Sequence, residues 1–138
     1  MLQPSPNVLN AFGLRDPHLS PAPRGWGRGI LADSIVLTPV VDRARATWSA
    51  RIRDTLDPSG IRIARPFRAT DGRTIVGDWR ADRYGAGVLQ NRPDEVVATS
   101  LRLHDALASH DRPRFLVGGP STPWSETDYF SMADRAAF

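Results

Sequence analysis

Three glycines at alternate positions, followed by a short apolar run, constrain the fold of this chain more than any other stretch. Gly25, Gly27 and Gly29 stand in the string PRGWGRG, and the run Ile35–Leu37 follows the turn 32–34. Glycine tolerates positive φ and lets backbone amides approach a ligand closely. The stretch therefore predicts a strand, a Gly-rich loop and a tight β-hairpin. The same spacing also fits a plain surface turn.

The segment after this hairpin predicts a helix. Asp42 stands in a capping position, and the helix is expected to run to about Leu56. Apolar residues recur every four positions and form one stripe, which is expected to pack on the sheet. The stripe consists of Ala44, Trp48, Ile52 and Leu56. Three arginines off this stripe are expected to cover a solvated face: Arg43, Arg51 and Arg53.

Further elements follow from proline, glycine and cap positions. Ser5 and Pro6 open a short helix that ends at Gly13. The prolines at 17, 21 and 23 favour an edge strand before the glycines. The segments 61–67 and 74–79 are of β type, and the string Thr70-Asp71-Gly72-Arg73 between them predicts a hairpin. A second long helix is expected from Pro93 to about 108, and a last one from about 122.

The composition excludes several kinds of chemistry. All 18 basic residues apart from histidine are arginine, so every mechanism that needs a lysine is excluded. There is no cysteine, which excludes disulfides, thiolate nucleophiles and cysteine-ligated metals. The histidines have no partners at metal-ligand spacing, so no metal site is expected. No run of residues approaches a membrane span or a signal peptide, and a cytoplasmic protein without membrane contact is expected.

Charge is distributed unevenly along the chain. Residues 1–92 carry 14 arginines against 8 aspartates, whereas residues 93–138 carry 4 arginines against 7 acidic residues. A basic front and an acidic back suggest two substructures that meet near residues 84–93, or a face for an anionic partner. The string RGWGRG adds an aromatic side chain between two arginines, which is the combination that single-stranded nucleic acid binds.

The motifs taken together resemble one family. They comprise the GxGxG pattern and the strings IVLTPV (35–40), ATWSA (46–50), IARP (63–66), LRLH (101–104), PW (123–124) and ADRAAF (133–138). The chain resembles the N-terminal half of an actinobacterial family of uncharacterised proteins related to aminoglycoside phosphotransferases. Proteins of that wider group are two-lobed and kinase-like, with ATP between a sheet-based lobe and a helical lobe. The resemblance covers essentially the whole chain.

The resemblance implies an incomplete nucleotide cleft. Its Gly-rich loop falls on the three glycines 25, 27 and 29, and its hinge falls on Tyr84 and Gly85. The lysine that would hold the phosphates falls on Thr38, and its helical glutamate partner is missing because Glu95 is the first glutamate of the chain. No aspartate is followed five residues later by asparagine, so the catalytic pair of the second lobe has no counterpart. No catalytic residue is therefore assigned.

The expected architecture is α+β. A kinase-like N-terminal lobe over residues 1–83 would hold an antiparallel sheet of about five strands with one packed helix. Residues 84–138 would form a hinge and the start of a helical lobe with two further helices, apparently incomplete.

Three functions remain open at this point. The first is a non-catalytic or truncated kinase-like domain, degenerate in its active site and free of cofactor. The second is half of an ATP-dependent phosphotransferase that a separate helical-lobe chain would complete. Of the three functions, only this one would need ATP and Mg²⁺. The third is an arginine-rich module that binds nucleic acid or another polyanion. A helical-lobe partner or self-association is expected of the first two, because a sheet lobe without its second lobe exposes apolar surface.

Overall fold

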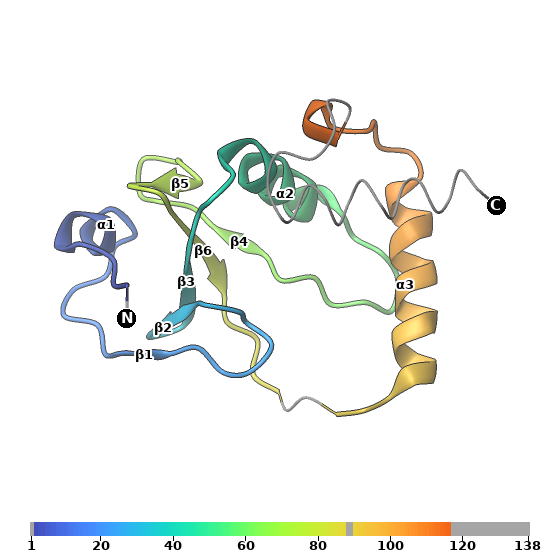
Figure 1. The fold of residues 1–138 in the computed structure, drawn as a ribbon, viewed down its shortest axis with the longest axis horizontal. Coiled ribbons are helices and arrows are strands. Elements are labelled where there is room, and N and C mark those ends of the chain that lie inside the picture. Colours follow the sequence, from blue (N-terminus) through green and yellow to red (C-terminus); the bar gives the residue numbers. More distant parts are fainter. Residues whose placement is uncertain (1, 88–89, 117–138) are drawn as a thin grey trace. The chain divides into compact units, whose positions relative to one another are not determined.

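The computed structural model describes residues 2–87 and 90–116 of the 138. These residues fall into two compact units that divide after Ala108. The elements, drawn in Figure 1, are α1 (Pro6–Ala11), β1 (Leu19–Pro21), β2 (Ile30–Ala32), β3 (Ile35–Pro39), α2 (Arg43–Thr55), β4 (Pro66–Phe67), β5 (Ile75–Val76), β6 (Trp79–Arg83), α3 (Pro93–Leu107) and the 3₁₀ turn η1 (Arg114–Leu116). The expected helix after residue 122 lies outside the described residues.

The strands form one open antiparallel sheet. Their order is β1-β2-β3-β6-β4, and the short β5 pairs with β6 outside this path. Tight turns join β2 to β3 and β5 to β6, so most neighbours in the sheet are also neighbours in the chain. The expected α+β class with an antiparallel sheet is confirmed, with six strands among the described residues where about five were expected. The proline-rich strand β1 lies at one edge, as expected.

The two faces of the sheet differ in chemistry. On one face Leu37 of β3 pairs with Ala81 of β6, and both belong to an apolar core that includes Val8 and Phe12 from the α1 region. On the other face the cross-strand pairs are Val36 with Asp82 and Thr38 with Arg80. Helix α2 lies on this second face, as its ion pair with Asp82 requires. The sheet therefore carries an apolar core on one side and a charged contact on the other.

Helix α1 forms as its sequence predicts. The Ser5 side chain accepts a hydrogen bond from the backbone N–H of Val8 at 3.4 Å, and proline stands at the start of the helix. Gly13 follows the helix with a φ of 75°, a conformation that glycine adopts at little cost. Val8 and Phe12 are then buried against the sheet.

Helix α2 begins and ends as expected, but it buries a different face. Asp42 caps the helix by accepting from the Arg45 N–H at 3.1 Å. The buried helical residues are Ala46 and Ala50, whereas Ala44 is exposed and Trp48 and Ile52 are only partly covered. The expected stripe is thus wrong at Ala44, only partly covered at Trp48 and Ile52, and buried at Leu56. The small side chains of Ala46 and Ala50 allow the helix backbone to approach the sheet. From this position the long Arg53 side chain reaches Asp82 on β6.

The strands after α2 also differ from expectation. The segment 61–67 contributes only the two residues of β4 to the sheet, and the turn around Asp71 and Gly72 is closed by Ala69 N–H donating to the Arg73 carbonyl at 2.9 Å. The tight hairpin instead joins β5 to β6 through Gly77 and Asp78, which have φ values of 53° and 62°. Trp79 therefore begins the central strand β6 rather than ending a strand.

Helix α3 has the expected start at Pro93 and caps at Ala108. Asp94 and Glu95 occupy its first turn, where the helix dipole favours acidic side chains. None of its residues is buried, and its apolar stripe is open to solvent: Val96, Val97 and Leu101 are 61%, 60% and 65% exposed. The helix belongs to the first compact unit. The predicted boundary after residue 83 stays a prediction.

Candidate functional site

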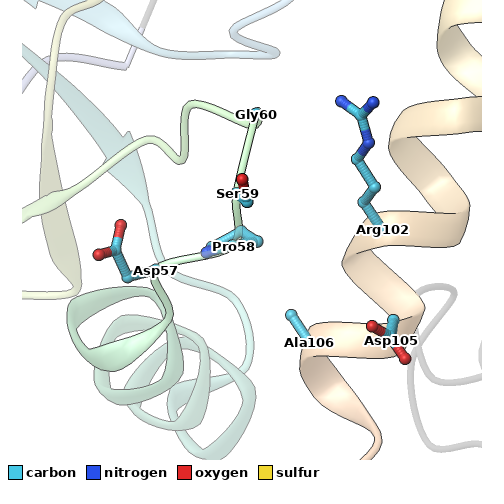
Figure 2. A pocket seen from close by; sticks show the side chains of 7 residues that line it. All are labelled: Asp57, Pro58, Ser59, Gly60, Arg102, Asp105 and Ala106. Atoms are coloured by element: carbon cyan, nitrogen blue, oxygen red, sulfur yellow. The ribbon is translucent and has the colours of Figure 1, made fainter.

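A shallow groove lies beside α3 (Figure 2). Its volume is about 480 Å³, and it is lined by residues 57–60 after α2 and by Arg102, Asp105 and Ala106 of α3. Arg102 points toward Gly60, where a Cβ atom would come within 2.7 Å of the Arg102 Nη1 atom. Asp57 at its rim is almost fully exposed and lies 3.8 Å from Arg65. This groove has no enclosed polar group that would orient a ligand.

The Gly-rich turn is an ordered double turn between β1 and β2. Trp26 N–H donates to the Pro23 carbonyl and Gly29 N–H donates to the Trp26 carbonyl, each at 3.2 Å. Ala22 N–H donates to the Gly29 carbonyl at 2.9 Å and closes the base of the hairpin. Gly25 has a φ of 103° and Gly27 a φ of 62°, and glycine adopts both conformations with the least strain.

Gly29 is required for a different reason. A Cβ atom at this position would lie 2.5 Å from Val36 Cγ1 and 3.1 Å from the Trp26 carbonyl oxygen. Gly29 therefore packs directly against β3, the strand that carries Thr38 two residues after Val36. Its small size serves the packing of the turn on the sheet, and no ligand is needed to explain it.

The tip of the Gly-rich turn touches the segment that follows β6. The rings of Trp26 and Tyr84 have centroids 5.9 Å apart, with 50° between their planes. Tyr84 is fixed in turn, because its N–H donates to the Ser34 carbonyl at 2.9 Å. Gly85 follows it and is exposed. The structure thus brings together the Gly-rich loop and the segment at Tyr84 that the sequence singled out. The contact is made by Trp26, which was not among the site residues predicted from the sequence.

Thr38 lies on the charged face of the sheet. It pairs with Arg80 in the register between β3 and β6, so the two side chains leave the sheet on the same side. Thr38 is half-buried and offers only a hydroxyl group. The cation nearest to it in register is therefore Arg80, from a strand that sequence reasoning had not recognised.

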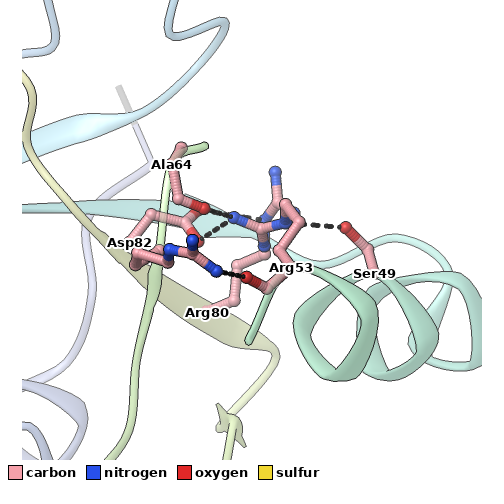
Figure 3. A network of polar contacts seen from close by, with 6 residues as sticks. Ser49, Arg53, Ala64, Arg80 and Asp82 are labelled. Carbon is pink, nitrogen blue, oxygen red and sulfur yellow. Dashed lines mark hydrogen bonds and ion pairs between the residues drawn. The ribbon is translucent and has the colours of Figure 1, made fainter. Parts of the chain in front are cut away.

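A largely buried ion pair joins α2 to β6 (Figure 3). Arg53 Nη1 donates to Asp82 Oδ1 at 2.7 Å and to the Ala64 carbonyl at 2.6 Å, and Arg53 Nε donates to Ser49 Oγ at 3.0 Å. The Arg65 side chain donates to the Arg53 carbonyl at 2.6 Å. The expectation that Arg53 covers a solvated face is wrong, since its side chain is only 19% exposed and that of Asp82 only 6%.

Arg80 completes this cluster. Its Nε atom lies 3.9 Å from Asp82 Oδ2, and one third of its side chain is exposed. Burial lowers the pKa of Arg80, Asp82 raises it, and the neighbouring charge of Arg53 lowers it further, with a net effect downward. Two cations thus share one buried carboxylate, which makes Asp82 the electrostatic centre of this face.

An alternation in the sequence could have revealed this strand. Trp79 and Ala81 face the apolar core, while Arg80 and Asp82 face α2, so the string WRADR alternates with the period of a strand. The three charged residues of this string masked the pattern, because a charged strand in the interior of a sheet is unusual.

The described residues offer neither a metal site nor a membrane-spanning helix. Within residues 2–87 and 90–116, no group of His, Cys, Asp or Glu side chains lies close enough together to hold a metal ion. No helix in the same ranges has the length and apolar character needed to cross a bilayer.

Comparison with known proteins gives no family assignment. No protein-family model matches the chain, and neither a curated protein nor a solved structure matches it. The resemblance to aminoglycoside phosphotransferase relatives therefore stays a prediction, and so do the site residues drawn from it.

Proposed function

We propose that the chain is a kinase-like sheet-and-helix lobe that does not catalyse phosphoryl transfer. The order of its elements supports this proposal. A Gly-rich turn joins β1 to β2, the third strand carries Thr38, helix α2 follows, and β6 leads into the segment at Tyr84. This is the order that the resemblance implies for a nucleotide-binding lobe.

The observation that carries the proposal is the charged link between helix and sheet. In protein kinases a lysine on the third strand pairs with a glutamate on the following helix, and this pair positions the phosphates. Here the cation is Arg53 on the helix and the carboxylate is Asp82 on β6. The Arg53 guanidinium donates to Asp82, Ala64 and Ser49. A link of this kind ties α2 to the sheet and provides no lysine–glutamate pair beside Thr38.

The loop contact supports the same conclusion. Trp26 lies against Tyr84, in the region where a nucleotide base would have to pass between loop and hinge. Aromatic pairs at this separation stabilise each other beyond their buried area. A bound nucleotide would have to displace this contact and would gain no lysine contact in return.

The experiment is titration calorimetry of the purified chain with Mg²⁺-ATP. We expect no binding heat at sub-millimolar nucleotide and no ATP turnover, because phosphoryl transfer depends almost entirely on positioned charge. Thr38→Lys should give at most weak binding, since α2 has no glutamate to orient the new amine. The matched variant is Arg80→Gln. If the wild-type chain binds Mg²⁺-ATP and Arg80→Gln does not, Arg80 takes the place of the lysine and the proposal is overturned.

A phosphotransferase completed by a second chain makes a different prediction. In that case a helical-lobe chain would assemble with this one in a fixed ratio and restore turnover. ATP hydrolysis by the mixture, sensitive to Thr38 or Arg80 substitution, would replace the proposed function with this one.

A further inference from the structure

Two partly exposed aromatic rings form a wedge on the surface of the first unit. The planes of Trp26 and Tyr84 are inclined by 50°, so the rings do not cover each other face to face. Both side chains are partly open to solvent. Trp26 is held at the tip of the double turn, and Tyr84 is held by its bond to Ser34. The wedge is therefore a built feature with ring surface available to a third flat group.

Two exposed arginines flank Trp26 in the chain. Arg24 and Arg28 stand two residues before and after it. Within the described ranges, neither of them forms an ion pair with an acidic side chain. Arg83 lies over the Phe67 ring, 5.2 Å from its centroid, on the apolar face of the sheet, and it does not contribute to the wedge.

The acidic groups near the wedge do not cancel this charge. Asp33 is exposed in the turn before Ser34, whose carbonyl accepts from Tyr84. Asp82, the other neighbour in sequence, is buried and paired with Arg53. Two exposed arginines and one exposed carboxylate therefore accompany the wedge in the chain, which leaves a net positive charge.

We propose that this aromatic–arginine surface (Arg24, Trp26, Arg28 and Tyr84) binds single-stranded nucleic acid. An unpaired base can stack on a ring of the wedge, while the arginines donate to the adjacent phosphates. An acidic peptide would use the arginines but has no flat group that requires the wedge. In a duplex the bases are paired and stacked, so their faces are not available to it. The proposal does not rest on the absence of catalysis.

The test is fluorescence anisotropy with the whole chain and a labelled oligothymidylate of about 12 nucleotides. We expect micromolar binding at low salt, and a slope of log K against log salt of about −1.4 from two phosphate contacts on a single strand. Trp26→Ala should weaken binding about tenfold, the scale of one lost base stack, and Trp26→Phe should restore most of it. The double variant Arg24→Ala/Arg28→Ala should reduce the slope to near zero.

Matched controls decide between sources of binding. Arg51→Ala removes an exposed arginine from α2 and should leave the affinity for oligothymidylate within about twofold of the wild type. This result would exclude an effect of net charge alone. Circular dichroism checks that the Trp26 variants stay folded. Polyglutamate of equal charge should bind more weakly than the oligonucleotide and should not respond to Trp26→Ala. Equal binding of polyglutamate, no detectable binding of oligothymidylate, or an affinity unchanged by Trp26→Ala would each overturn the proposal.

Discussion

The charged link between α2 and β6 gives the sharpest prediction about stability. Asp82→Asn keeps the shape of the side chain and removes the only carboxylate that Arg53 and Arg80 contact among the described residues. Loss of one partner from a buried ion pair costs about 3–5 kcal/mol. Arg53 is one-fifth exposed and keeps its bonds to Ala64 and Ser49, so part of its charge can be rehydrated. We therefore expect a loss of about 2–4 kcal/mol, a large part of the roughly 5–15 kcal/mol typical of a domain.

The structure offers a matched control for this substitution. Asp78 accepts from Arg43 at 2.8 Å, almost the same length as the Arg53–Asp82 bond, but the two side chains are 71% and 63% exposed. Asp78→Asn also suits the local φ of 62°, because asparagine tolerates this conformation. We expect a loss below about 1 kcal/mol, the usual scale of an exposed pair. The two ion pairs differ mainly in burial, so the difference between the two variants measures the effect of burial.

Urea unfolding followed by circular dichroism is the assay, with equal m-values required for the comparison. The double variant Arg53→Met/Asp82→Leu should recover most of the lost stability, since apolar residues of similar size often replace a buried pair without cost. An Asp82→Asn loss no larger than that of Asp78→Asn would refute the reasoning. It would mean that the link is solvated in solution.

Two further predictions concern the Gly-rich turn and the Asp71 turn. Gly29→Ala should destabilise the fold by about 1–3 kcal/mol, because the new methyl group meets the Val36 side chain and a backbone oxygen. Gly27→Ala places its methyl group in open space and should cost only about 1 kcal/mol of backbone strain. Urea unfolding of both variants will check this difference. The backbone N–H and then the side chain of Arg73 lower the pKa of Asp71, so its contribution to stability is present above the ordinary aspartate pKa and is lost as pH falls through the lowered value. An NMR titration should find Asp71 still below its ordinary value in Arg73→Ala, since the backbone donor remains; a return to the ordinary value would contradict this order of causes.

Local features of the sequence determined where elements begin and turn. Ser5, Asp42 and Pro93 each stand at the start of a helix in the structure, because capping groups and proline act on the first turn of their own segment. The glycines at 25 and 27 mark a real turn for the same reason, since positive φ is a property of single residues. These effects depend only on neighbours in the chain, so they can be read without knowing the fold.

The tertiary structure decided which side chains meet. The face of α2 that is buried follows from the approach of Ala46 and Ala50 to the sheet, and the four-residue apolar stripe did not indicate it. Strand β6 became central only through its pairing with β3 and β4, which are distant in the chain. Its charges are tolerated there because Arg53 comes from another element to meet Asp82.

The same division holds for the candidate sites. The sequence indicated the Gly-rich loop and the hinge, but the contact of Trp26 with Tyr84 exists only because β2, β3 and β6 lie side by side. The ion pair between Arg53 of α2 and Asp82 of β6 could not be read from the sequence alone. The register of the strands and the position of α2 on the sheet set the distances in both contacts. Both depend on long-range packing that no local pattern encodes.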